Sequence, residues 1–411
     1  MVNFSSKSLR ISQGVHWVGI NDTKTPLFEE LWSIPEGVSY NSYLVQGSKK
    51  TALIDSVNEK NAAEHFEKIS RLTDVSKIDY LVVNHMEPDH TGAIPQLLEK
   101  APNAQLVLTP IAQIIFKKFY GKDPSTVLVK GEEVKISLGD KTLQFIQTPW
   151  LHWPETMSTY LLENKTLFCC DAFGAFKKLP DGAILESSMD IEKQNVCDCS
   201  QKYFASVFNG QREWVLKAID KFKEMNLDIK VLAPSHGPVY TAAVNETLQR
   251  WAAWSKGNYK KIVVVVYGSM YGITAKCLKV IEEGVKEAGG AVRIFNLSKC
   301  DPVDALTAVL EAPAIIFGSP TYEHDVFPKI SDFLNLLKVK KFKDRCVGVF
   351  GSFGWSGEAT QKLSTELVEL EFELVDKPFP IYGSPTVQDL EKVKQLGKMV
   401  AQKAFAKFQV S

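Results

Sequence analysis

The sequence predicts two α/β domains in tandem, a layered sandwich of sheets and covering helices followed by a doubly wound domain. The 411 residues exceed what one ordinary core accommodates. The first half mixes short apolar runs with polar turns, whereas five consecutive β-branched residues, 262–266, open the second half. We place the border before residue 256, which gives domains 1–255 and 256–411.

The first domain is predicted from short runs of β-forming residues and two segments with helical spacing. The expected strands are 43–45, 51–55, 80–83, 106–108 and 143–146, and the expected helices are 62–72 and 111–119. This mixture indicates sheets that are covered by helices rather than a purely β or purely helical domain.

The second domain is predicted from a repeated order of strand, loop and helix. The strand 262–266 leads through a glycine-bearing loop into the helical segment 275–288, and strands 314–317 and 347–350 repeat the theme. Residues buried on both faces of a strand are typical of parallel sheets. The alternation therefore predicts a doubly wound α/β domain.

Composition excludes several classes of function. The chain has 48 Lys and Arg residues and 48 Asp and Glu residues. It therefore carries no net positive charge that would favour binding to nucleic acid. No apolar run reaches the roughly 20 residues that span a bilayer, and the N-terminus has no apolar signal region. Seven cysteines without C-x-x-C pairs indicate free thiols in a reducing cytoplasm. For Cys197 and Cys199 a redox pair or a soft metal site is the alternative to free thiols.

A cluster of metal-ligating residue types follows the expected strand 80–83. His85, Glu87, Asp89 and His90 lie within six residues. In an extended segment His85 and Glu87 project to the same side, and a turn at Pro88 lets Asp89 and His90 reach a second position. A single histidine or carboxylate is more often a surface or hydrogen-bonded residue, but the combination suits two adjacent metals.

Three further candidate ligands also follow expected strands. His152, Asp171 and His236 come shortly after strand-like segments, where loops of layered folds build sites. Each one alone fits a structural role better than a ligand role. Taken in order with the first cluster, the three complete a set of four imidazoles and three carboxylates.

Three loops of the second domain indicate a site for a planar, phosphate-bearing cofactor. Loop 267–274 offers hydroxyls and backbone N–H groups at a helix N-terminus, which bind anions, although it lacks the lysine of a nucleotide P-loop. Loops 318–323 and 351–357 combine glycine, hydroxyl and aromatic residues. Glycine permits close approach, and aromatic rings can flank a planar ring system. An ordinary tight turn would explain any one loop by itself.

The first domain resembles the metallo-β-lactamase fold, an αββα sandwich with a dinuclear site. This resemblance implies one metal on His85, Glu87 and His152, another on Asp89, His90 and His236, and Asp171 as the bridge. Zinc hydrolases of the fold usually carry a histidine where this chain has Glu87. A carboxylate makes the set harder and more anionic, which favours iron.

The second domain resembles flavodoxin and implies bound FMN. The residues implied as FMN contacts are Ser269, Met270, Tyr271, Gly272, Ile273, Thr274, Ser319, Pro320, Thr321, Tyr322, Glu323, Ser352, Phe353, Gly354, Trp355 and Gly357. The first loop would hold the phosphate, and the other two would enclose the isoalloxazine. Glu323 stands where many flavodoxins have asparagine.

Together the two domains resemble the flavodiiron proteins, or A-type flavoproteins, in their simplest arrangement. The resemblance implies an oxidoreductase that reduces dioxygen to water, nitric oxide to nitrous oxide, or both; we expect dioxygen. Electrons would pass from an external donor, such as rubredoxin or a reduced deazaflavin coenzyme, through FMN to two iron ions. A dizinc hydrolase fused to a flavin domain is the alternative, and an electron carrier with a vestigial metal site is a third hypothesis.

The family resemblance also implies an assembly and roles for single residues. The subunits would form a head-to-tail homodimer, alone or as a dimer of dimers, with the FMN of one subunit facing the irons of the other. Trp355 would lie between them, unless it is a ring-packing residue. Tyr203 would donate a hydrogen bond to bound oxygen species, unless it is a core tyrosine. Phe176 replaces a histidine found in many relatives, which predicts a less polar pocket.

Overall fold

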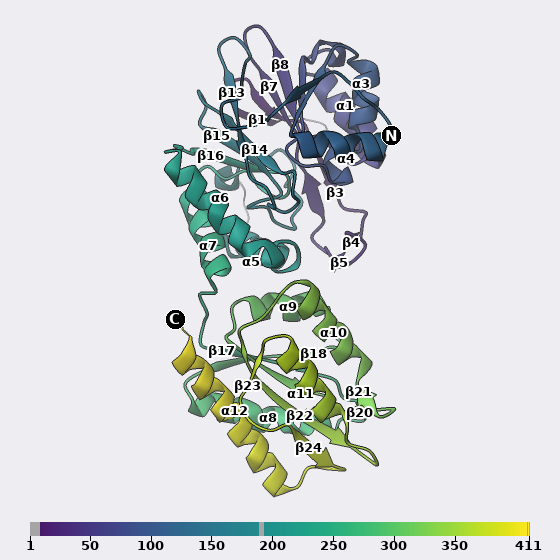
Figure 1. Cartoon of the computed structure of the whole chain (residues 1–411), viewed down its shortest axis with the longest axis vertical. Coiled ribbons are helices and arrows are strands. Elements are labelled where there is room, and N and C mark those ends of the chain that lie inside the picture. Colours follow the sequence, from purple (N-terminus) through teal and green to yellow (C-terminus); the bar gives the residue numbers. More distant parts are fainter. Residues whose placement is uncertain (1–8, 189–192, 409, 411) are drawn as a thin grey trace. The chain divides into compact units, whose positions relative to one another are not determined.

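The computed structural model describes residues 9–188, 193–408 and 410, and the chain forms two compact units (Figure 1). The first unit comprises Met1–Phe204 and Gln211–Ala252, and the second comprises Ala205–Gly210 and Ala253–Ser411. The predicted domain border before residue 256 stays a prediction. The first eight residues of the predicted first domain lie outside the described residues.

Two sheets form the centre of the first unit. The first has the order β1-β2-β7-β8-β9-β10-β11 and the second has the order β12-β13-β14-β15-β16. The strands of the first sheet are β1 (Leu9–Ser12), β2 (Val15–Trp17), β7 (Tyr43–Gln46), β8 (Thr51–Ile54), β9 (Tyr80–Val82), β10 (Gln105–Leu108) and β11 (Thr126–Leu128). Those of the second are β12 (Lys135–Ser137), β13 (Thr142–Gln147), β14 (Met157–Leu161), β15 (Thr166–Cys170) and β16 (Val231–Pro234).

Short strand pairs and helices complete the first unit. The two-stranded pairs are β3 (Ile20–Asp22) with β6 (Val38–Tyr40), and β4 (Leu27–Phe28) with β5 (Trp32–Ser33). The α-helices are α1 (Ala62–Ser70), α2 (Pro88–Thr91), α3 (Ile94–Lys100), α4 (Pro110–Tyr120), α5 (Lys193–Tyr203), α6 (Arg212–Glu224) and α7 (Val244–Lys256). A π-helical segment, Phe204–Phe208, follows α5; its residues from Ala205 on, and those of α7 from Ala253 on, are assigned to the second unit.

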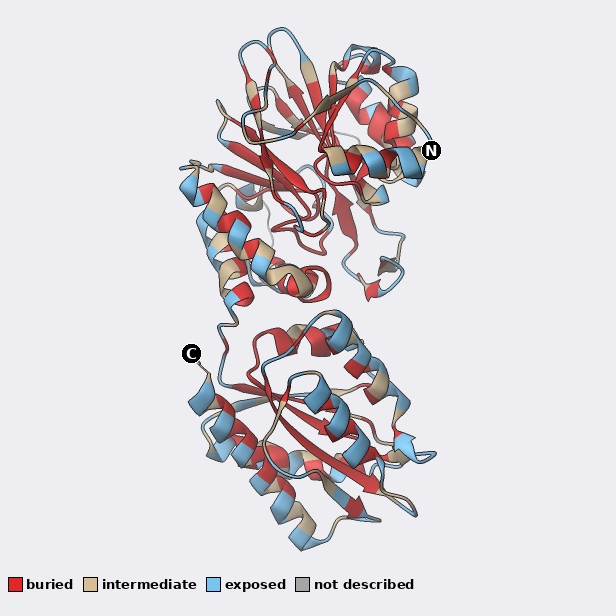
Figure 2. Ribbon diagram, viewed as in Figure 1, coloured by how far each residue is buried: buried red, intermediate tan, exposed pale blue. Residues whose placement is uncertain are grey.

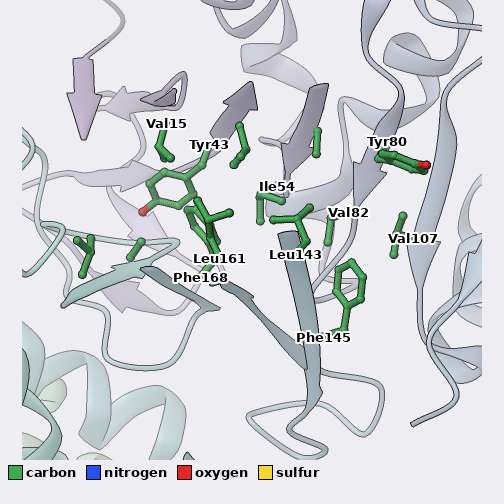
Figure 3. Packing of buried hydrophobic residues seen from close by; sticks show 14 of the residues in the cluster. Val15, Tyr43, Ile54, Tyr80, Val82, Val107, Leu143, Phe145, Leu161 and Phe168 are labelled. Carbon is green, nitrogen blue, oxygen red and sulfur yellow. The ribbon is translucent and has the colours of Figure 1, made fainter. Parts of the chain in front are cut away.

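The core of the first unit lies between its two sheets. Tyr43 and Ile54 of the first sheet and Leu143 and Phe168 of the second belong to one buried cluster, and Figure 3 shows their side chains gathered between the strands. Each fully buried apolar side chain of this kind contributes about 1.5–3 kcal/mol. The packed sheets therefore hold the strand ends, and the loops that follow them, in fixed positions.

The second unit is built around a parallel sheet in the order β18-β17-β19-β22-β23, with β24 paired to β22. Its strands are β17 (Ile262–Tyr267), β18 (Ala291–Asn296), β19 (Ala314–Gly318), β22 (Cys346–Phe353), β23 (Glu373–Leu374) and β24 (Phe379–Tyr382). A separate hairpin pairs β20 (Thr321–Tyr322) with β21 (Asp325–Val326). As the run of β-branched residues predicts, residues 262–266 are buried on both faces of the sheet (Figure 2).

Helices cover both faces of this sheet (Figure 1). They are α8 (Leu278–Glu287), α9 (Pro302–Leu310), α10 (Pro328–Val339), α11 (Ala359–Glu369) and α12 (Val387–Lys407). Gly284 of α8 lies against the backbone of α12: a Cβ built there would be 2.1 Å from the carbonyl oxygen of Lys394. The predicted doubly wound architecture is confirmed.

Among the described residues, none of the helices combines the length and the apolar character that crossing a membrane requires.

Candidate active site

The seven predicted metal ligands converge at one end of the two-sheet core. His85 follows β9, Asp171 follows β15, His236 follows β16, and His152 lies in the loop from β13 to β14. The side chains form two adjoining groups whose possible ligand atoms lie within 4.8 Å of one another. The groups are His85, Glu87, His152 and Asp171, and then Asp89, His90 and His236.

The turn at Pro88 separates the two groups, as the sequence predicts. Glu87 is extended, with φ −61° and ψ 140°, and serves as the N-cap of α2, in which Pro88 takes the first position. The Thr91 hydroxyl donates to the carbonyl oxygens of Met86 (3.3 Å) and Glu87 (3.0 Å). The short helix therefore points Asp89 and His90 away from the extended segment that carries His85.

Asp171 lies between the two groups and touches all four imidazoles. Its Oδ1 is 2.8 Å from His90 Nε2 and 3.0 Å from His236 Nε2. Its Oδ2 is 3.1 Å from His152 Nε2 and 3.4 Å from His85 Nε2. One carboxylate oxygen thus serves each group, which is the arrangement a bridging ligand requires.

The pKa shifts of the clustered histidines and of Asp171 show that this site stabilises positive charge. Burial works to lower the pKa of His152, but hydrogen bonds with Asp171 and Glu87 raise it to about 9. Burial has the same effect on His236, and Asp171 and Asp89 raise its pKa to about 10. Burial works to raise the pKa of Asp171, yet His90 and its other imidazole neighbours hold it well below the usual range. A bound metal cation takes the place of those imidazole protons.

Asp89 provides an observation that tests whether metals fit. Both of its carboxylate oxygens are buried, and neither accepts a hydrogen bond from the described residues. His90 Nε2 and His236 Nε2 lie 3.3 and 3.4 Å from these oxygens, without hydrogen-bonding geometry. Carboxylates and imidazoles that share a small volume in this way match the donor set of a transition-metal pair, so the residues fit the predicted metals.

Residues outside the predicted set fix the orientation of the imidazoles. His236 Nδ1 donates to the backbone carbonyl of Ser39 (2.8 Å), and His85 Nδ1 faces the Glu155 carboxylate (2.7 Å). Asp55 accepts from the backbone and side-chain N–H groups of Asn84, which precedes His85. The sequence analysis missed Glu155 and Ser39, because neither belongs to a ligand motif.

An aromatic wall of Phe28, Tyr40, Phe176 and Tyr203 surrounds His236. The rings of Phe28, Tyr40 and Tyr203 have centroids 5.2, 5.4 and 5.7 Å from the His236 ring. Phe176 packs on Phe28 at 5.0 Å and on Tyr203 at 4.9 Å. The structure thus places Tyr203 and Phe176 beside the cluster, and it adds Phe28 and Tyr40, which the sequence analysis did not identify.

Burial keeps the Tyr203 hydroxyl protonated. Burial, reinforced by the charges of Asp171 and Asp89, raises the pKa of Tyr203 well above its ordinary value. A phenol that keeps its proton can donate a hydrogen bond. The predicted hydrogen-bond role of Tyr203 stays a prediction.

Cys170 lies close enough to the cluster to be a further candidate ligand. Its Sγ falls within 4.8 Å of the ligand atoms of His90 and Asp171. Burial raises the pKa of the Cys170 thiol well above its ordinary value, and Ser235 donates to its sulfur at 3.4 Å. Cys170 is not one of the seven predicted ligands, and its sulfur accepts this hydrogen bond from Ser235.

The three predicted loops of the second unit meet around a pocket of about 280 Å³. Its lining residues are Ser269, Met270, Tyr271, Ile273, Thr274, Pro320, Thr321, Ser352, Phe353, Gly354, Trp355 and Gly383. The Thr274 and Ser352 hydroxyls lie 2.9 Å apart and link the first loop to the third. Only Gly383, at the end of β24, was absent from the predicted set.

The remaining predicted contacts lie outside this lining: Gly272, Ser319, Tyr322, Glu323 and Gly357. The Ser319 hydroxyl donates to the Pro320 carbonyl and accepts from Phe327 N–H, so it braces its own loop. The Ser269 hydroxyl is buried and has no hydrogen-bond partner among the described residues. An unpaired hydroxyl in a loop that opens a helix fits the predicted phosphate group.

Trp355 is 71% exposed at the rim of the pocket, and its ring meets that of His324 edge-on at 4.5 Å. Tyr271, in the first loop, and Tyr382, the last residue of β24, are also highly exposed. Exposed rings that gather beside one pocket are typical of an interaction surface. Trp355 is therefore not a buried packing residue in the described chain.

Comparison with known proteins identifies both units. A family model described as ODP family beta lactamase matches residues 38–237, and the Flavodoxin model matches residues 265–397. The chain is 32% identical to the "Nitric oxide reductase" of Moorella thermoacetica over 398 residues, covering 96% of this chain and 98% of that protein.

Solved structures agree along the whole chain. The rubredoxin oxygen:oxidoreductase from Desulfovibrio gigas superposes with a TM-score of 0.93 at 29% identity, covering 97% of this chain and 99% of that one. The flavodiiron protein from Giardia intestinalis gives a TM-score of 0.92 at 27% identity, covering 97% of each chain. The predicted αββα metallo-β-lactamase-like sandwich followed by a flavodoxin-like domain is thereby confirmed, and the chain belongs to the flavodiiron protein family.

Proposed function

We propose that this protein is a flavodiiron oxidoreductase that reduces dioxygen to water, nitric oxide to nitrous oxide, or both. One observation carries the proposal: the four imidazoles and three carboxylates of the cluster meet on the same chain as a flavodoxin unit. Relatives with the same two units are named as a nitric oxide reductase and a rubredoxin oxygen:oxidoreductase.

The cluster is proposed to hold two iron ions. His85, Glu87 and His152 form one position, Asp89, His90 and His236 form the other, and Asp171 links the two. Held by these residues, two iron ions would supply the redox chemistry for reducing the gas, and FMN would supply the stored electrons. Three anionic side chains among seven ligands favour iron in its higher charge state over zinc.

The aromatic wall is proposed to control water and protons around the cluster. Phe28 and Phe176 are buried and offer no polar atom, so they exclude bulk water from the His236 side. Tyr203 keeps its phenolic proton and presents a hydrogen-bond donor in the wall. The wall would therefore suit a small apolar gas and offer it a hydrogen-bond donor beside the cluster.

The pocket of the second unit is proposed to hold FMN. Ser269 and Thr274, near the start of the helical segment, suit the phosphate, whereas Trp355 and Phe353 flank the space for the ring system. Electrons reach FMN from an external donor, which we expect to be rubredoxin or a reduced deazaflavin coenzyme. We place the protein in the cytoplasm, with its domains spanning 1–255 and 256–411.

The alternative of a dizinc hydrolase finds no support. The compared proteins are named as reductases, oxidoreductases or flavodiiron proteins. Zinc has no redox chemistry, so a zinc pair could not accept electrons from a flavin unit.

A head-to-tail homodimer is part of the proposal. The rim of the FMN pocket exposes Trp355, Tyr271 and Tyr382, and the first unit exposes Ile114 and Trp150. Exposed apolar and aromatic side chains of this kind mark interaction surfaces. Covering one subunit's FMN rim with the other's metal-bearing unit would bury these rings and bring Trp355 between the two cofactors.

Anaerobic oxidation of the reduced protein tests the function. The protein is produced with iron and zinc both supplied, loaded with FMN, reduced, and mixed with dioxygen or nitric oxide in separate experiments, and metal content is measured on the same sample. We expect about two irons per chain and flavin reoxidation by at least one gas. A protein that binds zinc in preference, or whose reduced flavin is inert to both gases, would contradict the proposal.

A further inference from the structure

Glu155 is a buried carboxylate that touches a proposed metal ligand without being a ligand itself. The Glu155 side chain is fully buried, and its Oε1 lies 2.7 Å from His85 Nδ1. The same oxygen accepts the backbone N–H of Met86 at 2.9 Å. His85 therefore has its Nδ1 held by Glu155, while its Nε2 faces Glu87 and Asp171.

Glu155 also ties together three segments that build the site. It lies three residues after His152 in the loop between β13 and β14. Its backbone carbonyl accepts the Thr109 hydroxyl at 2.9 Å, at the start of α4. The Trp153 ring meets the His85 ring edge-on at 5.0 Å. The His85 ring thus has little freedom to rotate.

The Nδ1 atoms of His236 and His90 have surroundings different from those of His85 Nδ1. His236 Nδ1 donates to a neutral backbone carbonyl, that of Ser39. His90 Nδ1 is buried without a hydrogen-bond partner among the described residues. Glu155 therefore gives His85 a carboxylate hydrogen-bonded at Nδ1, which neither histidine of the Asp89 position has among the described residues.

We propose that Glu155 is a positioning residue that makes the two metal positions chemically inequivalent. A carboxylate that accepts from the outer nitrogen of a ligating imidazole fixes its tautomer and raises its basicity. The metal on His85, Glu87 and His152 then receives more electron density than the metal on Asp89, His90 and His236. Its oxidised form is stabilised, so it has the lower midpoint potential of the pair. This inference rests on the proposed diiron function.

Two substitutions separate charge from geometry. Glu155→Gln keeps an oxygen for the His85 and Met86 N–H groups and removes the negative charge. Glu155→Ala removes both contacts and leaves the imidazole without a support. Thr109→Val is the matched control, since it removes the hydrogen bond to the Glu155 backbone and leaves its carboxylate in place. Thermal unfolding and FMN content verify that each variant folds.

The measurements are an anaerobic iron(II) titration against a competing chelator and a redox titration of the metal pair followed by EPR. We expect Glu155→Ala to weaken binding of one of the two irons about 10- to 100-fold. We expect Glu155→Gln to keep both irons and to raise one metal midpoint potential more than the other, with the FMN potentials unchanged. A tenfold change in the ratio of ferric to ferrous affinity corresponds to about 59 mV. Thr109→Val should change neither property, although it lowers stability.

The two proposals fail separately. If Glu155→Gln leaves both metal potentials at their parental values, or Glu155→Ala binds two irons as tightly as the parent, Glu155 only braces the fold and the inference is overturned. If the parent binds two irons and responds to these substitutions but reduces neither gas, the inference stands and the proposed function falls. A Thr109→Val variant that reproduced the Glu155→Gln shift would also refute the role of the charge.

Discussion

At the scale of single residues, Glu87 is the position that distinguishes the proposed iron site from a zinc site. Its Oε2 lies 3.2 Å from His85 Nε2 and 3.1 Å from His152 Nε2. Hydrogen bonds with these two imidazoles outweigh burial and hold the pKa of Glu87 well below its usual range, so it is ionised. The carboxylate therefore contributes one of the three negative charges around the metals.

Glu87→His should lower iron occupancy, because a neutral imidazole replaces an anionic ligand. We expect iron to fall by about half or more and the zinc content to rise when both metals are offered in equal amounts. Metal analysis of the purified variant measures the change. Glu87→Asp is the control that keeps the charge and shortens the side chain; iron retention equal to the parent in Glu87→His would contradict the assigned ligand role.

Phe176→His tests the pocket argument. The new side chain would stand between Phe28 and Tyr203, and it would add a titratable donor to a wall that has none at this place. Reduction of dioxygen to water consumes more protons than reduction of nitric oxide, so we expect the ratio of dioxygen to nitric oxide turnover to rise, by about tenfold where proton transfer limits the rate. Phe176→Leu is the apolar control, and an unchanged ratio in Phe176→His would defeat the argument.

The sequence could predict residues of the site that share a local motif, but not those that meet it from a distance. The close spacing of four residues identifies them as candidate ligands: His85, Glu87, Asp89 and His90. Glu155 and Phe28 have no such spacing, since they reach the cluster through contacts between segments far apart in the chain. Side-chain contacts of that kind leave no periodic signal in the sequence.

At the scale of elements, α1 shows how a helix that carries no ligand still constrains the first unit. His65 is fully buried on this helix, its Nδ1 donates to the carbonyl of Val18 at 2.9 Å, and its Nε2 has no partner among the described residues. Burial lowers the pKa of His65 to about 4. The folded protein therefore keeps this imidazole neutral.

The stability of the first unit should fall as pH drops from about 6.5 to about 4. In this range the unfolded chain binds a proton at His65 and the folded chain does not, so protonation favours unfolding; above pH 6.5 the effect is absent. The shift implies a loss of about 3 kcal/mol at most. Urea unfolding of the parent and of His65→Gln at several pH values measures it. An equal pH dependence in both proteins would show that His65 is not responsible.

Elements with a strong periodic or β-branched pattern were predictable, and short or half-polar ones were not. The strand that became β17 and the helices that became α1 and α4 were predicted within a few residues. The strands β3 to β6 span only two or three residues each, too few to form a pattern. Strand β14 is fully buried but contains serine and threonine, so burial in the sandwich overrides its polar composition.

At the scale of the whole molecule, the proposed route of electrons depends on the assembly. The metal cluster belongs to the first unit and the flavin pocket to the second, each complete within its own unit. In a head-to-tail dimer the working pair of cofactors comes from two different subunits. Symmetry makes this arrangement testable, because a C2 dimer contains two such pairs.

Complementation between two inactive variants tests the head-to-tail arrangement. Asp171→Asn removes the charge that all four imidazoles share and should abolish metal binding. Ser269→Asp places a carboxylate in the proposed phosphate loop and should abolish FMN binding by charge repulsion. Each variant alone should lack activity for its own reason, and metal and flavin analysis verifies this.

Mixed dimers of the two variants should regain activity. If electrons cross between subunits, the intact FMN of the Asp171→Asn chain faces the intact metals of the Ser269→Asp chain. Random pairing of equal amounts then makes half of the dimers mixed, each with one working pair, which gives about a quarter of the parental activity. Co-refolding or co-expression followed by turnover assays measures it. Mixed dimers that form, as shown by two affinity tags, but stay inactive would mean that electrons do not pass from one subunit to the other.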